Sequence, residues 1–179
     1  MEFKDSETYK NLQKAYDIER MSSTKYRIYA DKARTDGYEV IGETYDEFSH
    51  NEKEHAKIWL RQMNDGRIPS TMENLEEALG GETYEATRMY TTYAEQAMAE
   101  GYSEIARLFR EVAIIEQYQN FRFEKFALEL AEGSLFCKQR NTIWICMNCG
   151  QLFYGECAPE ICSVCGYPQA FYKQNCETY

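Results

Sequence analysis

The 179-residue sequence lacks the features that mark several classes of protein. It has only two histidines and three prolines, and none of its seven cysteines precedes residue 137. No stretch approaches the roughly 18 consecutive apolar residues that a membrane span requires, and the N-terminal residues lack the apolar core of a signal peptide. Lysine and arginine number 20 against 30 acidic residues, and the net charge of −10 argues against nucleic acid or an anionic membrane as the main partner. We therefore expect a cytoplasmic protein that binds neither.

What the sequence does contain, over residues 5–132, is a helical pattern. Apolar residues recur at intervals of three and four, and Glu, Ala, Lys, Tyr and Met are abundant. Gly37 and Gly101 mark two tight corners, while Gly66 and Pro69 end one helix before Ser70 and Glu73 supply a capping box for the next. The pattern predicts four helices, near residues 6–35, 37–65, 71–100 and 102–132.

An internal repeat organises these helices. Residues 26–55 match residues 90–119 at an offset of 64, the difference between Tyr26 and Tyr90. The matched residues are Tyr26, Tyr29, Ala30, Ala33, Gly37, Tyr38, Ile41 and Glu52 in the first copy and Tyr90, Tyr93, Ala94, Ala97, Gly101, Tyr102, Ile105 and Glu116 in the second. A single helical hairpin cannot bury its apolar stripe, so the two copies predict an all-α four-helix bundle.

Acidic residues within the repeat suggest a metal centre in the bundle. Glu52 and His55 share one helix face, and the repeat places Glu116 on the matching face of the fourth helix. The other candidates are Glu19 on the first helix and the pair Glu82 and Glu85 on the third. Any one of these is more simply a solvent-facing glutamate, but their places in matched hairpins favour two bound iron or manganese ions.

One position breaks the symmetry of this predicted centre. Gln119 stands where the repeat would place the counterpart of His55, and a neutral amide binds iron less strongly than an imidazole. His50 lies off the face of Glu52, so we interpret it as a surface residue. Tyr26 and Tyr90 lie one to two turns after Glu19 and Glu85, where their hydroxyls would orient ligating carboxylates. Packing in the core is an equally good explanation of both tyrosines.

The C-terminal part predicts a second metal site. Two CxxCG segments contain Cys146 and Cys149, and Cys162 and Cys165, and each is followed by a glycine that permits the backbone to direct amide hydrogens at sulfur. Spacing alone leaves zinc or iron open, and coupling to a redox-active bundle favours iron. We expect Trp144, Tyr154 and Phe171 to pack beside this site, and Cys137, Cys157 and Cys176 to be spare thiols. The predicted division is a bundle over 1–134, a linker over 135–141 and a small β/loop module over 142–179.

These residues resemble those of rubrerythrins over nearly the whole chain. The segments that carry the resemblance are NEKEHAK around Glu52, GETYE around Glu82, and the terminal WICMNCG, APEICSVCG and PQAFY. The resemblance implies a ferritin-like di-iron bundle joined to a rubredoxin-like domain, acting as a hydrogen peroxide reductase. It also implies that Glu52 and Glu116 bridge the irons, that Glu19 and Glu82 are terminal ligands, and that Glu85 and His55 alternate on one iron. Gln119 departs from the histidine that the family places at the second iron.

Chain length limits the path of the bundle. The helices are roughly 40–45 Å long, whereas the six or so residues between the second and third helices span only about 20 Å. We therefore expect either a simple up-down-up-down path or a homodimer that exchanges hairpins, of which the second is our hypothesis. The expected partners are hydrogen peroxide and an electron donor, either an NAD(P)H-linked reductase or a rubredoxin. The alternatives are a ferritin-like protein that oxidises or sequesters iron, and a metal-poor bundle with a structural zinc ribbon.

Overall fold

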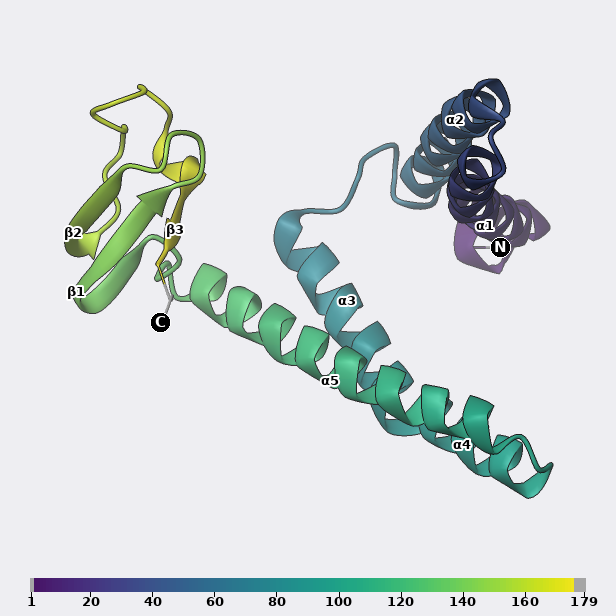
Figure 1. Ribbon diagram of the computed structural model, residues 1–179. Helices are drawn as coiled ribbons and strands as arrows, with labels where there is room; N and C mark the ends of the chain where they lie inside the picture. Colours follow the sequence, from purple (N-terminus) through teal and green to yellow (C-terminus); the bar gives the residue numbers. More distant parts are fainter. Residues whose placement is uncertain (1, 176–179) are drawn as a thin grey trace. The chain divides into compact units, whose positions relative to one another are not determined.

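The computed structural model describes residues 2–175, which fall into two compact units that meet between Ser70 and Thr71. The first unit is a helical hairpin of α1, Glu7–Thr35, and α2, Glu39–Met63, preceded by the short 3₁₀ turn Phe3–Asp5 (Figure 1). Ser6 caps α1, because its hydroxyl accepts a hydrogen bond from the Tyr9 amide at 3.1 Å. This hairpin supplies the first two predicted helices.

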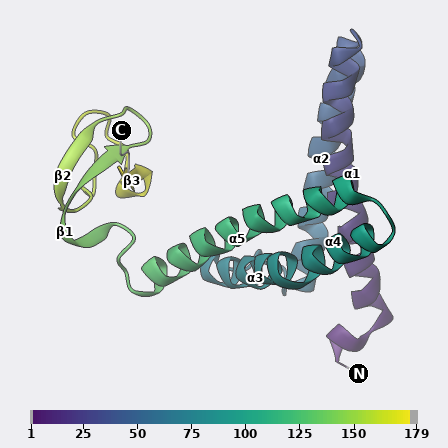
Figure 2. The same cartoon turned by 60° about the horizontal axis from the view of Figure 1, so that its bottom comes forward.

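The second unit begins with another hairpin. Its first arm consists of α3, Thr71–Tyr84, a π-helical turn, Glu85–Met89, and α4, Tyr90–Ala99. Its second arm is α5, Ser103–Ala131, which runs alongside α3 and α4 (Figure 2). The prediction of one helix over 71–100 is confirmed except for the π turn, a feature that often marks functional sites within helices. Together the hairpins provide the four helices of a ferritin-like bundle.

The two hairpins have the same corner, as the repeat predicts. Gly37 and Gly101 adopt φ angles of 86° and 87°, a region that suits glycine. The amide of the next residue then donates to a carbonyl in the preceding helix, at 2.9 Å in the first corner and 2.8 Å in the second. Gly42 lies close to the first helix, and a Cβ there would be 2.9 Å from the Arg34 side chain, so glycine avoids a clash. The residue at the matching position of the second hairpin is Ala106, which is fully buried.

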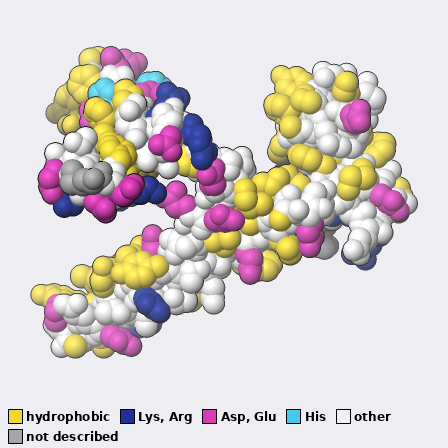
Figure 3. All heavy atoms as spheres, turned by 180° about the vertical axis from the view of Figure 1, so that it is seen from behind, with side chains coloured by type: hydrophobic (Ala, Val, Ile, Leu, Met, Phe, Trp, Pro, Cys, Tyr) yellow, Lys and Arg dark blue, Asp and Glu magenta, His cyan; other side chains and the backbone are white. Residues whose placement is uncertain are grey.

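Packing inside each hairpin depends on small residues. Ala30 and Ala33 are buried in the first, and Ala94 and Ala97 in the second. Large apolar side chains remain exposed along the helices, among them Ile18, Ile28, Ile114, Ile115, Tyr118 and Phe121, and Figure 3 shows apolar groups gathered on the helical surfaces. Each hairpin therefore presents an apolar face that its own two helices do not cover.

The C-terminal module follows α5 and is a three-stranded antiparallel sheet. Its strands are β1, Cys137–Cys146, β2, Leu152–Cys157, and β3, Tyr172–Gln174, in the order β2-β1-β3. Its small core contains Trp144, Cys146, Ala158, Cys162 and Tyr172. Strand β1 begins inside the stretch 135–141 that the sequence predicts as a linker, since Cys137 already pairs with Cys157.

None of the helices in residues 2–175 has both the length and the apolarity needed to cross a membrane.

Candidate metal centres

In the first hairpin, the structure brings three of the predicted ligands together. Oxygen and nitrogen atoms of Glu19, Glu52 and His55 all lie within 4.8 Å of one another. His55 Nδ1 is 3.3 Å from Glu52 Oε2 and 3.8 Å from Glu19 Oε2. Both carboxylates are largely covered, whereas the His55 side chain is 50% exposed. The three groups could hold a metal ion, with two hard oxygen donors and one imidazole.

The two carboxylates of this cluster influence each other's pKa. A hydrogen bond between them, supported by burial, raises the pKa of Glu19, while the same hydrogen bond lowers the pKa of Glu52. Two like charges this close are unfavourable unless a proton or a cation lies between them. The pair therefore fits a divalent cation, which would neutralise both charges.

In the second hairpin, two of the predicted ligands, Glu82 and Glu116, interact with each other. Burial, and then a hydrogen bond with Glu116, raise the pKa of Glu82. Glu82 Oε2 is buried and has no hydrogen-bond partner among the described residues. A buried carboxylate oxygen without a partner is costly, and a metal ion would supply the missing interaction. The donor chemistry here also fits a metal.

Glu85 lies in the π turn, near Glu82 and Tyr90. Its negative charge contributes to the raised pKa of Glu82. Burial, followed by the charge of Glu85, also raises the pKa of Tyr90, to which Glu116 and Glu82 contribute as well. Tyr90 thus lies among the three carboxylates of this hairpin. Its repeat counterpart Tyr26 packs on Tyr45, with ring centroids 5.8 Å apart.

The structure gives Gln119 a half-buried position, one turn after Glu116 on α5. The neighbouring Asn120 ties α5 to the first arm of the hairpin, because its side-chain amide donates to the Leu79 carbonyl at 3.2 Å and to the Thr83 hydroxyl. His50 is exposed, as expected. Sequence reasoning missed Trp59, which lies close enough to Glu19 to lower its pKa. Its spacing of seven residues from Glu52, two turns along the same helix, was the available signal.

The four cysteines of the two CxxCG segments converge in the module. Cys146 Sγ is 3.7 Å from Cys165 Sγ, and Cys149 Sγ is 3.6 Å from Cys162 Sγ. A tetrahedral ion with metal–sulfur bonds of about 2.3 Å separates its sulfurs by roughly 3.8 Å. The four thiols therefore have the spacing that one iron or zinc ion requires.

The backbone around this site repeats, as the two segments predict. Gly150 and Gly166 have φ angles of 78° and 74°, and their amides donate to the carbonyls of Cys146 and Cys162 at 2.8 and 2.9 Å. The amide of the residue after each glycine, Gln151 or Tyr167, then bonds the second sulfur of its segment. These donors stabilise thiolate charge.

Two side chains that the sequence did not single out complete the site. The Tyr172 hydroxyl donates to Gln151 Oε1 at 2.7 Å, and Cys162 Sγ lies 3.0 Å from the same oxygen. The nearby Tyr172 side chain and the backbone amides of Cys165 and Val164 together lower the pKa of Cys162 to about 6, so this sulfur favours the thiolate form that binds metal.

Two sequence predictions about the module are wrong. Tyr154 does not pack beside the cysteine site, since it is 68% exposed. Tyr172, on β3, is buried in the core beside the site instead. Trp144 is buried in that core as expected, while Phe171 is partly exposed. Cys137 and Cys157 are not spare thiols, since antiparallel pairing of β1 with β2 sets them opposite each other and they form a disulfide. Cys176 lies outside the described residues.

A carboxylate and histidine cluster in one helical hairpin, interacting carboxylates in the repeated hairpin and a four-cysteine site are typical of a carboxylate di-metal protein with its own small thiolate metal module. Comparison with known proteins agrees with this class. The rubrerythrin family model matches residues 10–127, and the model of the rubrerythrin rubredoxin-like domain matches residues 144–173.

Relatives of known name match over most of their length. A Methanocaldococcus jannaschii protein that carries the rubrerythrin name is 37% identical over 97% of this chain and 95% of its own. The rubrerythrin of Nitratidesulfovibrio vulgaris is 34% identical over 95% of both chains, and that of Clostridium perfringens 34% over 98% of both. The chain belongs to the rubrerythrin family, whose cofactors are a di-iron centre and an iron held by four cysteines.

Replacing Gln119 with histidine should strengthen metal binding at the second-hairpin position by roughly tenfold or more, because imidazole is a better iron ligand than a neutral amide. Anaerobic titration of the metal-free protein with ferrous ion would measure the two affinities. Gln117→His, at an exposed neighbouring position, is the matched control and should leave both affinities unchanged. Equal affinities in the natural protein and Gln119→His would show that residue 119 does not contact the metal.

Proposed function

We propose that this protein is a non-haem di-iron peroxidase, which reduces hydrogen peroxide to water in the cytoplasm as a defence against oxidative stress. The observation that carries the proposal is the presence, in one chain, of carboxylate half-sites in both hairpins and a four-thiol site suited to single-electron transfer. A protein that only stores iron needs the carboxylates but has no use for the thiolate module.

The ligands we assign to the di-iron centre are Glu19, Glu52, His55, Glu82, Glu85, Glu116 and Gln119. When bound, the two irons supply the two electrons that convert peroxide to water. The pKa of Glu19 is raised beside Glu52, so binding of metal would release any proton held there and leave two carboxylates that balance the metal charge. His55 is half exposed, which leaves it room to approach or leave a metal as the charge at the site changes. Tyr90 is half-buried, and the charges of Glu85, Glu116 and Glu82 add to its raised pKa, so it would keep its proton and could orient these carboxylates by hydrogen bonding.

We assign the entry of electrons to the iron held by Cys146, Cys149, Cys162 and Cys165. The backbone amides and the Tyr172 side chain stabilise negative charge on sulfur. Interactions of this kind influence the reduction potential of an iron held by thiolates. Its exposed Cys149 gives an external donor access to the site. An NAD(P)H-linked reductase or a rubredoxin would fill the role of donor.

We also propose that two chains exchange hairpins to complete their bundles. Each hairpin covers small alanines between its helices and leaves larger side chains, such as Ile115 and Phe121, more than half exposed. The short stretch between α2 and α3 cannot follow the full length of a bundle. Sedimentation of the metal-loaded protein should therefore show a dimer down to low concentration. A monomer that retains both bundle metals would rule out the exchange.

Anaerobic stopped-flow tests the proposed reaction. The iron-loaded protein is fully reduced and mixed with one equivalent of hydrogen peroxide, and the return of the ferric thiolate colour is followed. We expect the ferric colour to return quickly with peroxide and much more slowly with oxygen. The colour returns only when the iron of the cysteine site passes its electron to the oxidised bundle, so it reports that the two sites are connected. Rapid oxygen consumption with accumulation of ferric iron, and no preference for peroxide, would instead support iron oxidation and sequestration.

A further inference from the structure

The disulfide between Cys137 and Cys157 lies outside both metal centres. Cys137 is the first residue of β1 and Cys157 the last of β2, and they stand directly opposite each other. The Ala158 amide donates to the Phe136 carbonyl at 2.8 Å just beyond them, so the cysteines occupy a non-hydrogen-bonded pair. Opposite side chains are closest at such pairs. The two sulfurs therefore meet without any change in the strand ladder.

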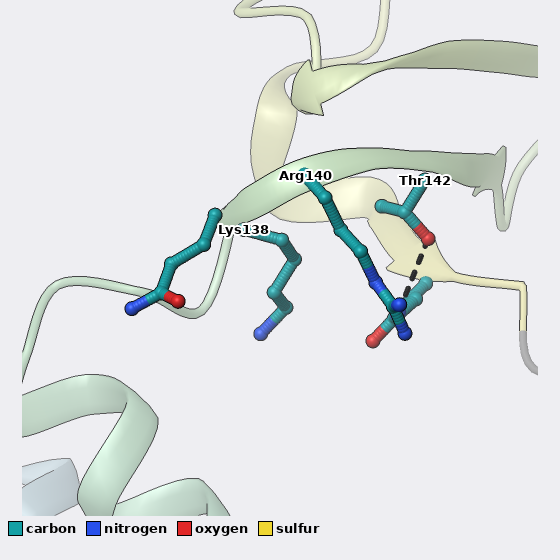
Figure 4. Close-up of a pocket in the computed structure, with 5 residues that line it drawn as sticks. Lys138, Arg140 and Thr142 are labelled. Atoms are coloured by element: carbon teal, nitrogen blue, oxygen red, sulfur yellow. Dashed lines mark hydrogen bonds between the residues drawn. The ribbon is translucent and has the colours of Figure 1, made fainter.

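This pair fastens a weak end of the sheet. The ladder between β1 and β2 is interrupted after Cys137 and resumes at Thr142, opposite Gly155, so residues 138–141 bulge away from β2. Figure 4 shows Lys138, Arg140 and Thr142 projecting from this part of β1, with Thr142 accepting a hydrogen bond from the Gln174 side chain. Beyond the disulfide, the backbone bond that joins the two chain segments is the one from the Ala158 amide to the Phe136 carbonyl. The disulfide therefore adds a covalent link where the backbone ladder is interrupted.

The fastened end leads to the cysteine metal site. Ala158, next to Cys157, is buried in the same core as Cys146 and Cys162, and Phe136 packs against that core. The Ala158 carbonyl also accepts a hydrogen bond from the Gln169 side chain at 2.6 Å. The chain then runs from Ala158 to Cys162 within five residues. Holding Cys157 to Cys137 therefore restrains β1, which ends at the ligand Cys146, and the segment after Ala158 that leads to the ligand Cys162.

The pair is accessible to small oxidants and reductants, because Cys157 is exposed and Cys137 is half-buried. Exposed disulfides are more readily reduced than buried structural ones, and they include the regulatory ones. We propose that Cys137 and Cys157 form a reversible thiol–disulfide pair, oxidised by hydrogen peroxide, that clamps the module and slows loss of its cysteine-bound iron.

The chemistry balances with peroxide as the oxidant. The Cys157 thiolate attacks one peroxide oxygen and the O–O bond breaks, which gives a sulfenic acid and a hydroxide that takes up a proton from solvent to become water. The Cys137 sulfur then displaces the hydroxyl as a second water and forms the S–S bond, so two electrons pass from the thiols to peroxide. A dithiol reductant restores both thiols by exchange. These steps need no metal, so they stand independently of the reaction proposed for the bundle.

The disulfide would form under the conditions that threaten the cysteine site, namely exposure to peroxide. Peroxide also attacks the thiolates that hold iron, and the same oxidant would close the disulfide. The two cysteines are 20 positions apart, and a disulfide that closes a loop of this length lowers the entropy of the unfolded module and so stabilises the folded one. We expect the oxidised pair to slow release of the cysteine-bound iron by roughly tenfold or more.

The test uses the full iron-loaded chain in two redox states. Protein reduced with a phosphine is divided, and one part receives a brief pulse of hydrogen peroxide. Alkylation and peptide mass mapping should show Cys137 and Cys157 alkylated in the first part, joined in the second, and alkylated again after treatment with a dithiol. Loss of ferric thiolate colour to excess chelator should be slower in the oxidised part. Cysteines 137 and 157 that stay alkylatable after peroxide, or equal rates of metal loss, would overturn the proposal.

Two variants separate the pair from other thiols. The double variant Cys137→Ser, Cys157→Ser should lose iron at the fast rate whether or not it meets peroxide. Cys176→Ser, which removes the other cysteine outside the metal site, should respond to peroxide like the natural protein. A Cys176→Ser protein without the response would assign the protection to a different thiol. The comparison of the natural protein in its two states does not depend on how well either variant folds.

Discussion

Replacing Glu52 with glutamine should lower the rate of peroxide reduction by at least about 100-fold. Glu52 lies within reach of both Glu19 and His55 and is the carboxylate of the first hairpin that we expect to bridge the metals. A neutral amide can neither bridge two irons nor balance their charge. Stopped-flow measurement of the ferrous protein with peroxide would give the rate, and metal analysis would show fewer bundle irons per chain.

The control for this variant is Glu47→Gln on the same helix. Glu47 is exposed, and the same change of charge there should leave metal content and rate as in the natural protein. The iron of the cysteine site should be retained in both variants, so its colour reports that the protein is intact. A Glu52→Gln protein that keeps two bundle irons and reacts at the natural rate would mean that the bundle centre is assembled from other residues.

Replacing Cys162 with serine should abolish the ferric thiolate colour and unfold the module. Cys162 is 1% exposed, contributes one of the four sulfurs and sits in the small core with Trp144 and Tyr172. Binding of a structural ion by four such ligands contributes about 10–16 kcal/mol in small zinc domains, far more than a core of this size supplies. Visible absorbance and near-ultraviolet circular dichroism of the buried Trp144 would measure the loss.

Val164→Ala tests whether the effect is specific to the ligand. Val164 lies between Cys162 and Cys165 and is 69% exposed, so its truncation should leave the colour and the circular dichroism unchanged. The helical signal in the far ultraviolet should persist in Cys162→Ser, since the hairpins contain none of the four sulfurs. Retention of the ferric colour in Cys162→Ser would show that three thiolates suffice.

The helices were predictable because their signals are local. Glycine at 37 and at 101 marks a corner that needs a positive φ, and both corners form at those residues. The structure adds a ring contact that also follows the repeat, with Tyr26 beside Tyr45 and Tyr90 beside Phe109 at centroid distances of 5.8 and 5.9 Å. The π turn at Glu85–Met89 escaped prediction, because one extra residue in a helical turn leaves the apolar spacing almost unchanged.

The sequence predicted the ligands of the candidate sites, but not all of the residues that pack around them. Ligand types and spacings identified the four sulfurs and the carboxylates, since metal-binding segments place their donors at short, regular intervals. Tyr172 could not be chosen over Tyr154, because both are aromatic residues near a CxxCG segment. Only the strand order β2-β1-β3 turns one of them into the core and leaves the other exposed.

The sequence by itself determined the class of this protein: two copies of a helical hairpin with metal-binding carboxylates, and a module built on four cysteines. These features follow from periodicity, glycine positions and donor spacing, which act between residues close in the chain. Tertiary structure alone decided that Cys137 meets Cys157, that Glu19 lies beside Glu52, and that Tyr172 and Cys162 meet at Gln151. Each of these depends on the distance between residues from different elements, and that distance is set by how strands pair and helices pack.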